Sequence, residues 1–211
     1  MGAGTSASKK YAVHADVEGG KKQIEKKVAA EGRSGGAAEE DVWATVVADL
    51  ARRGISVDAA LDLYVLARKQ MRDFDPKRTT TRDVVRRVVI PNSVKPEPRA
   101  YAQTAMKLVP TMPRRMVTHN WENLFVDLLA AVVADALGEI YYGSVAERLC
   151  DPDGVEVLRE EIVAAERKRG SHGPSTQILA RLTYWIDAVS VNQHVTIEDP
   201  ERMEVNKLVD I

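Results

Sequence analysis

Two short polar segments carry side chains that could do chemistry. The first is His119-Asn120-Trp121-Glu122, and the second is Asn192-Gln193-His194. Two histidines beside a carboxylate can act as general acid and base, or can bind a metal ion. The candidate catalytic residues are therefore His119, Glu122 and His194, and the candidate ligand-binding residues are Asn120, Trp121, Asp187, Asn192 and Gln193. We assign no cofactor and no metal ligands.

Each polar segment follows a predicted strand. The first strand spans Arg115–Thr118, and a helix that runs to Leu137 follows it, with Gly138 as its stop and Asn120 or Asn123 as its cap. The second strand spans Tyr184–Val191, an apolar run that suits a strand buried on both faces. Helices between the two strands favour a parallel pair. If the strands are neighbours, both polar segments lie at one edge of the sheet, where α/β sheets bind ligands.

A structural interpretation of the same residues stays open. Asn120 could cap the helix, Asn192 and Gln193 could satisfy turn backbone, and the histidines could be half-exposed loop residues. Trp121 could pack against the core or stack on a planar ligand. Asp187 is a carboxylate within an apolar run, so it needs a partner: Arg114, Arg115 or a cluster of backbone N–H groups.

The remaining patterns predict mostly helices. Residues 39–75 form a helical hairpin, with one helix over Glu39–Arg53 and a second capped by Ser56. A third helix follows Thr81, with a strand at Val88–Ile90 as the alternative. The proline-rich stretch 91–113 is a connector with one short helix near Tyr101–Leu108. Further helices are predicted at Ser144–Leu149, from Val155 to Arg169, and at Ser175–Leu182.

Residues 1–38 are predicted to be a flexible basic arm. Gly2 and Ser6 fit the M-G-x-x-x-[ST] pattern for N-myristoylation, and Lys9 and Lys10 follow directly. One acyl chain beside a basic cluster would hold the protein at the inner leaflet of a membrane. Starts rich in Gly, Ala and Ser are also common in disordered tails, so both interpretations stay open.

Composition excludes several classes of protein. The net charge of −1 gives no general electrostatic case for nucleic acid binding. The single cysteine, Cys150, rules out an internal disulfide. No apolar run approaches the roughly 20 residues that span a bilayer, and no secretion signal stands at the start. We therefore expect a cytoplasmic protein, associated with a membrane if Gly2 is acylated.

Two sequence motifs resemble known families. Thr183–His194, TYWIDAVSVNQH, resembles the "YWIDALCINQ" strand of fungal heterokaryon-incompatibility (HET) domains, which are similar to Toll/interleukin-receptor (TIR) domains. The likeness lies in Trp185, Ile186, Asp187, Val191, Asn192 and Gln193. Residues 116–137 also resemble an uncharacterised family associated with dinoflagellate algae, in which a "THNW" strand end precedes a "YW…NQ" strand.

The resemblance implies a flavodoxin-like α/β domain with a parallel sheet over residues 76–211, which the chain could leave incomplete. It implies a signalling or self-association role with protein partners. Some TIR domains cleave NAD with a glutamate on a later helix. Glu198, Glu201 and Glu204 fall in no recognisable motif, so none is assigned that role.

Three functional hypotheses follow. The first is a signalling or self-association module of TIR/HET-like type, tethered to a membrane if Gly2 is acylated. The second is a hydrolase of a nucleotide such as NAD that uses the residues at the strand ends. The third is an inactive gene fragment, suggested by the few residues that follow the second strand.

Overall fold

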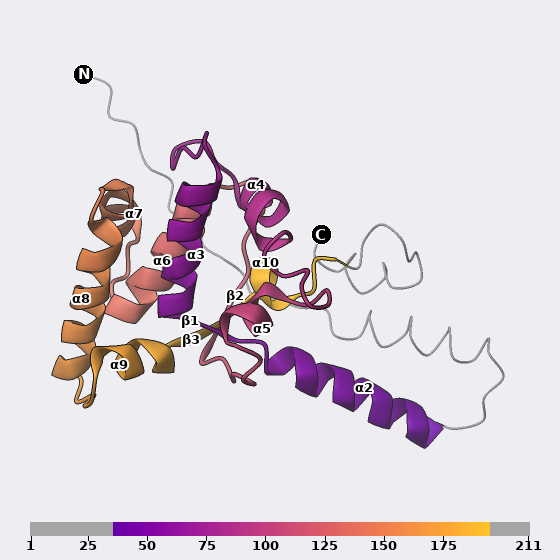
Figure 1. Ribbon diagram of the computed structural model, residues 1–211. Helices are drawn as coiled ribbons and strands as arrows, with labels where there is room; N and C mark the ends of the chain where they lie inside the picture. Colours follow the sequence, from indigo (N-terminus) through magenta and orange to yellow (C-terminus); the bar gives the residue numbers. More distant parts are fainter. Residues whose placement is uncertain (1–35, 195–211) are drawn as a thin grey trace.

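The computed structural model describes residues 36–194, which form a mixed α/β domain (Figure 1). Gly2, the lysines of the predicted arm and the glutamates after His194 lie outside the described residues. A small three-stranded sheet with the strand order β1-β3-β2 stands beside a larger group of helices. No helix in this part of the chain is both long enough and apolar enough to cross a membrane.

The helices and strands follow one another along the chain in this order: α2 (Gly36–Ala51), β1 (Ile55–Ser56), α3 (Val57–Gln70), α4 (Thr81–Val84), the π-helical turn η1 (Val85–Val89), α5 (Tyr101–Ala105), β2 (Arg115–Val117), α6 (Phe125–Leu137), α7 (Gly143–Cys150), α8 (Gly154–Lys168), α9 (Ser175–Arg181), β3 (Thr183–Ile186) and α10 (Asp187–Ser190).

β3 is the central strand of the sheet. It pairs in parallel with β2, with Met116 opposite Trp185, which confirms that the two predicted strands are parallel neighbours. It pairs in the antiparallel direction with β1, with Ile55 opposite Tyr184. The expectation of a parallel sheet is therefore wrong for β1, which was not predicted as a strand because two residues are too short to show a period.

One face of the sheet is closed by helices, which here we call the inner face. Residues opposite each other in neighbouring strands share a face, so Ile55, Tyr184 and Ile186 lie together, and all three are buried. The Tyr184 hydroxyl donates a 2.9 Å hydrogen bond to Asp135 of α6. The inner face, α3 and α6 therefore form one core, which the apolar residues of α8 and α9 extend.

The other face, which we call the outer face, is covered only in part. Its residues are Ser56, Thr183, Trp185 and Met116. The end of α2 reaches it, since Trp185 Nε1 donates to Leu50 O at 3.0 Å, and the connector reaches it, since Thr183 Oγ1 donates to Met112 O at 2.8 Å. Met116 is nevertheless 50% exposed. The outer face is therefore covered less completely than the inner face.

Several helix ends follow the capping signals in the sequence. The Ser56 side chain accepts from Ala59 N at the start of α3, as predicted. Thr80 and Asp83 form a reciprocal capping box at the start of α4. Gly138 ends α6 with a φ of 79°, which favours glycine. α6 begins differently from the prediction, because its cap is Leu124 and no side chain, neither Asn120 nor Asn123, caps it.

Three other predictions need correction. β3 ends at Ile186 and the apolar run continues as the short helix α10, so the predicted strand to Val191 is too long. Val88 lies in η1, so the alternative strand there is wrong. Both helices of the predicted hairpin exist, but β1 separates them, and α2 extends away from the domain in Figure 1.

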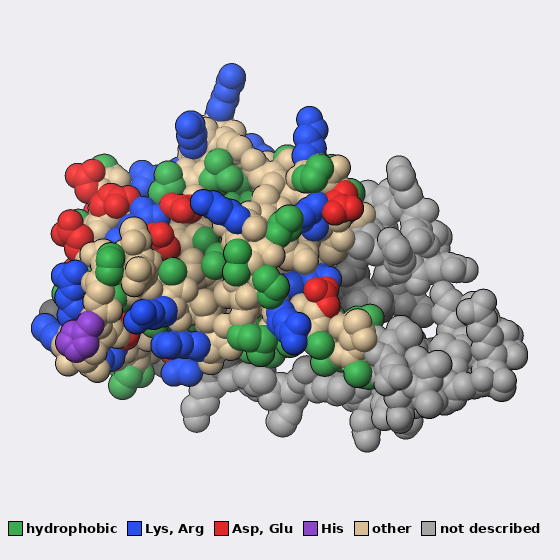
Figure 2. Space-filling model, turned by 60° about the horizontal axis from the view of Figure 1, so that its bottom comes forward, with side chains coloured by type: hydrophobic (Ala, Val, Ile, Leu, Met, Phe, Trp, Pro, Cys, Tyr) green, Lys and Arg blue, Asp and Glu red, His purple; other side chains and the backbone are tan. Residues whose placement is uncertain are grey.

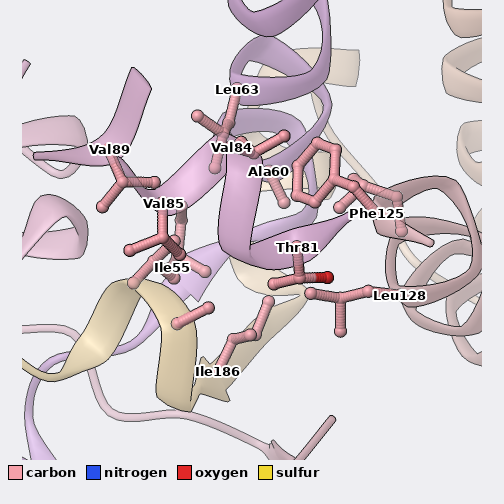
Figure 3. Close-up of a pocket in the computed structure, with 13 residues that line it drawn as sticks. Ile55, Ala60, Leu63, Thr81, Val84, Val85, Val89, Phe125, Leu128 and Ile186 are labelled. Atoms are coloured by element: carbon pink, nitrogen blue, oxygen red, sulfur yellow. The ribbon is translucent and has the colours of Figure 1, made fainter. Parts of the chain in front are cut away.

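A small cavity lies within the core between the sheet, α3, α4 and α6 (Figure 3). Its volume is about 10 Å³, and twelve of its thirteen lining residues are apolar. The exception is Thr81, whose Oγ1 is buried and has no hydrogen-bond partner among residues 36–194. A buried water makes two to four hydrogen bonds, so we interpret the space as a packing void.

Thr81, which lines this void, and its neighbour Thr80 should respond in opposite ways to replacement by valine. Thr81→Val removes an unsatisfied hydroxyl and should leave the free energy of unfolding unchanged or raise it by about 1 kcal/mol. Thr80→Val removes the capping box and should lower it by about 1–2 kcal/mol. Urea unfolding of both variants tests the pair, and a Thr81→Val variant that is less stable than Thr80→Val would contradict the assignment.

Candidate functional site at the ends of β2 and β3

The carboxyl ends of β2 and β3 lie at the same edge of the sheet, since Val117 pairs with Ile186. After β2 the chain passes through a turn of polar residues before α6 begins at Phe125. After β3 it enters α10 directly, because Ser190 Oγ accepts from Ile186 N at 3.0 Å and the Asp187 carboxylate accepts from Ala188 N at 2.8 Å. These local hydrogen bonds between side chains and backbone favour the turn into α10 at this point.

Asp187 joins the two strand ends. Its carboxylate accepts a hydrogen bond from Trp121 Nε1 at 3.3 Å and another from the backbone N–H of His119. Both donors come from the turn after β2. Of the predicted partners of Asp187, the cluster of N–H groups is therefore confirmed, and Arg114 and Arg115 do not take part. The hydrogen bonds of Asp187 therefore connect the turn after β2 to the start of α10.

Burial decides the protonation of this carboxyl group. Desolvation raises the pKa of Asp187 above its ordinary value, and the hydrogen bonds from Ala188, Trp121 and His119 offset only part of the rise. A carboxyl group with a raised pKa can hold a proton closer to neutral pH than an exposed aspartate can. This is the property that a general acid or base needs, although it also arises in purely structural sites.

His119 is the second unusual group of the cluster. It is buried, and its Nε2 has no hydrogen-bond partner among the described residues. Burial lowers the pKa of the imidazole, and Asp127 together with the backbone of Asn123 and Leu124 opposes part of this shift. A neutral imidazole with one unsatisfied nitrogen is able to accept or donate one further hydrogen bond.

Gln193 completes the cluster, which we call the strand-end cluster: His119, Trp121, Asp187 and Gln193. The Gln193 side chain donates to the backbone carbonyl of Asp187 at 3.2 Å and is buried. The chain after α10 thus folds back onto its start. The two strand ends do meet, through Asp187, Trp121 and His119, but Gln193 joins them only through Asp187. The expected approach of His119, Asn120 and Glu122 to Asn192, Gln193 and His194 is seen in no hydrogen bond or ion pair of the described residues.

The other four predicted residues do not join them in any described contact. Glu122 forms an ion pair with Arg82 at 2.5 Å, and Asn120 accepts from the backbone N–H of Glu122. His194 contacts Ser93 Oγ at 3.0 Å, and Asn192 donates to Pro98 O at 3.4 Å. No hydrogen bond or ion pair among residues 36–194 links His119, Glu122 and His194.

The cluster therefore differs from a ready catalytic dyad or metal site. No group of three His, Cys, Asp or Glu residues able to hold a metal occurs in the described part of the chain. The His119 ring lies near the start of α6, whereas the His194 ring lies near the end of η1. The hydrogen bonds of the cluster are typical of a structural contact, and they hold the turn after β2 against α10.

A second surface, which the sequence analysis treated as a plain connector, emerges beside β2. Met116 of β2 and Met112, which precedes β2, are exposed, and Leu108 and Val109 are exposed earlier in the connector, beside the end of α2. Met112 is 62% exposed. Figure 2 shows hydrophobic side chains on the face that lies at the bottom of Figure 1. The available signal was a group of large apolar residues in a proline-rich stretch without helical periodicity.

Comparisons with protein-family models, with curated proteins and with solved structures found no match.

Proposed function

We propose that this protein is a self-association module of TIR/HET-like type, in which two copies of the chain join through β2 and the outer face of the sheet. The observation that carries the proposal is the open edge of β2, beside exposed Met112 and Met116. Large exposed apolar residues and unpaired edge strands both favour association with another chain.

The edge of β2 is complementary to itself. The backbone N–H of Arg114 bonds to Thr183 O in β3, so the backbone groups of Arg114 and Met116 face β3. Those of Arg115 and Val117 face away from the sheet, because this direction alternates along a strand. An antiparallel second copy would place Arg115 opposite Val117 in both directions, with paired N–H and C=O groups. The two Met116 side chains would then stand side by side on the outer face.

The proposed partner is therefore a second copy of this chain. The charges beside β2 are compatible with the antiparallel pairing of the two copies. Most homo-oligomers have twofold symmetry, in which one patch meets its own copy. In this register Arg115 lies opposite Val117 of the second copy, and its own ion-pair partner, Asp135, is 3.5 Å away, so the contact leaves neither arginine unpaired. The strand-end cluster supports this function by fixing the end of β2 against α10.

A negative charge introduced on this surface should separate the two copies. Met116→Glu places two carboxylates side by side at the proposed contact and should weaken the dimer by at least about tenfold, since like charges directly opposite are destabilising. Ile140→Glu is the matched control, because Ile140 is 89% exposed and lies in the turn after α6. Sedimentation equilibrium measures both dissociation constants, and equal effects of the two variants would contradict the proposed surface.

The membrane part of the proposal concerns Gly2, which lies outside the described residues. Its support is the acylation pattern and the following lysines in the sequence. The intact mass of the protein from eukaryotic cells tests it, and an unmodified Gly2 would remove the acyl tether without affecting the self-association proposal.

A nucleotide hydrolase is the second candidate, and one observation favours it: the buried His119 Nε2 without a partner, next to Asp187 with its raised pKa. It predicts that nicotinamide is released from NAD and that His119→Gln abolishes the release. The third hypothesis, an inactive fragment, predicts that the chain shows no cooperative unfolding transition.

A further inference from the structure

Residues 68–87 form a strongly basic segment in a chain that is nearly neutral. They contain eight Lys and Arg residues against three Asp residues, a net charge of +5, whereas the whole chain has −1. We call this surface the basic corner: Arg68, Lys69, Arg72, Lys77, Arg78, Arg82, Arg86 and Arg87. The net charge of −1 for the whole chain conceals this local excess of positive charge.

The basic corner is one continuous surface. The end of α3, the turn after it and η1 lie side by side, since Arg87 pairs with Asp73 at 2.5 Å. The side chains of Gln70 and Asn92 also bond to each other, at 2.8 and 3.2 Å. The end of α3 and the turn after it lie remote from the sheet, uppermost in Figure 1, whereas Arg82 reaches Glu122 in the turn after β2. The proposed dimer contact uses Arg115, Met116 and Val117, none of which belongs to the basic corner.

Most of its charge is not neutralised within the described part of the chain. Arg82 and Arg87 have carboxylate partners, Glu122 and Asp73. Five other basic side chains are exposed and form no ion pair with any residue of 36–194: Lys69, Arg72, Lys77, Arg78 and Arg86. Asp83 accepts the hydrogen bonds of the Thr80 capping box and offsets part of the charge of Arg86 and Arg87, and the net charge of +5 already includes it.

We infer that the basic corner binds the anionic lipid headgroups of a membrane surface. Clustered Lys and Arg at a protein surface are attracted to anionic headgroups, and the attraction needs no groove, because lipids move laterally beneath the cluster. Binding of single-stranded nucleic acid relies on exposed aromatic rings for base stacking. The aromatic ring in the segment, Phe74, is half-buried and packs edge-on against Tyr64, with the centroids 5.5 Å apart.

This inference rests on the proposal that the protein works at a membrane. It names a second membrane contact, in the folded domain, which forms with or without an acyl chain on Gly2. The folded domain would supply the basic signal, whether or not residues 1–35 contribute one. The unpaired residues of the basic corner are not among the β2 residues of the proposed dimer contact, so one membrane contact and one self-association contact can form together. A dimer would present two basic corners to the bilayer, which increases the overall avidity.

Sedimentation of the unacylated full chain with phosphatidylserine-containing vesicles tests the inference. We expect wild-type protein to bind these vesicles but not pure phosphatidylcholine vesicles, and to lose binding at about 0.5 M salt. The triple variant Lys69→Glu, Arg72→Glu and Arg78→Glu should bind at least about tenfold more weakly. Replacement of the same three residues by Gln gives a second variant without new charge, which should show a smaller loss in the same direction.

The matched control carries three charge reversals in the predicted arm: Lys21→Glu, Lys22→Glu and Lys26→Glu. It should bind more tightly than the variant of the basic corner. Equal loss in both triple variants, or wild-type binding to nucleic acid without binding to vesicles, would overturn the inference. The molar mass of the same samples is measured separately, so a protein that dimerises without binding vesicles contradicts only this inference, and a monomer that binds them contradicts only the self-association proposal.

Discussion

Replacing Asp187 by alanine should lower the free energy of unfolding by about 3 kcal/mol at pH 4. The substitution leaves Trp121 Nε1 and the N–H groups of Ala188 and His119 without their acceptor, and a buried unsatisfied donor costs about 1–3 kcal/mol. Asp153→Ala is the control, because Asp153 is exposed and its side chain caps nothing, so its effect should stay within about 0.5 kcal/mol.

The pH dependence of the Asp187 variant has a definite sign. Because burial raises the pKa of Asp187 in the folded state above 3.8, the folded state binds the proton more tightly than the unfolded state. The contribution of Asp187 to stability is therefore greatest at low pH and falls as the pH rises from about 4 through the folded pKa. The cost of Asp187→Ala should shrink over that range in urea unfolding experiments. A cost that grows with pH, or a value under about 1 kcal/mol at pH 4, would contradict the role of Asp187.

Replacing Gly154 by alanine should destabilise the domain by about 3 kcal/mol, because the new Cβ collides with backbone. It would overlap the carbonyl oxygen of Arg148 and lie 2.7 Å from its carbonyl carbon. The end of α7 crosses this close to the start of α8, so neither helix can move aside without repacking. A close approach of two backbones leaves no sign in the sequence besides glycine, so this constraint on Gly154 is visible only in the structure.

Gly143 provides the matched control at the start of α7. A Cβ there meets no heavy atom within 4 Å, so Gly143→Ala should leave stability unchanged or raise it by about 0.4–1 kcal/mol. Thermal unfolding of the two variants compares them directly. If Gly154→Ala melts at the wild-type temperature, α7 and α8 do not approach each other as described.

The sequence predicted the framework of the site better than its details. Polar turns, capping residues and helical periodicity located β2, α6 and β3, and the long crossover between the strands predicted their parallel pairing. The end of β3 was missed, because the apolar residues of α10 are too few to show whether their period is that of a strand or a helix. That short helix carries the chain toward Ser93, and so it separates His194 from His119.

The exposed features were missed for a related reason. Periodicity identifies residues that face a core, but it does not reveal which apolar residues lack a partner. The stripe of α2 looks like a core stripe in sequence, yet Val46 and Val47 are exposed. The edge of β2 depends on which strand lies at the side of the sheet, which is a property of the folded topology alone.

The most direct test of self-association through β2 is the molar mass of the wild-type chain in solution, measured by light scattering over a range of concentrations. The monomer has a mass of 23.3 kDa. We expect the measured mass to rise toward that of a dimer as the protein concentration increases. The dimer should persist at high salt, because backbone hydrogen bonds and methionine side chains form the contact. A mass of 23.3 kDa at every concentration would contradict the proposed function.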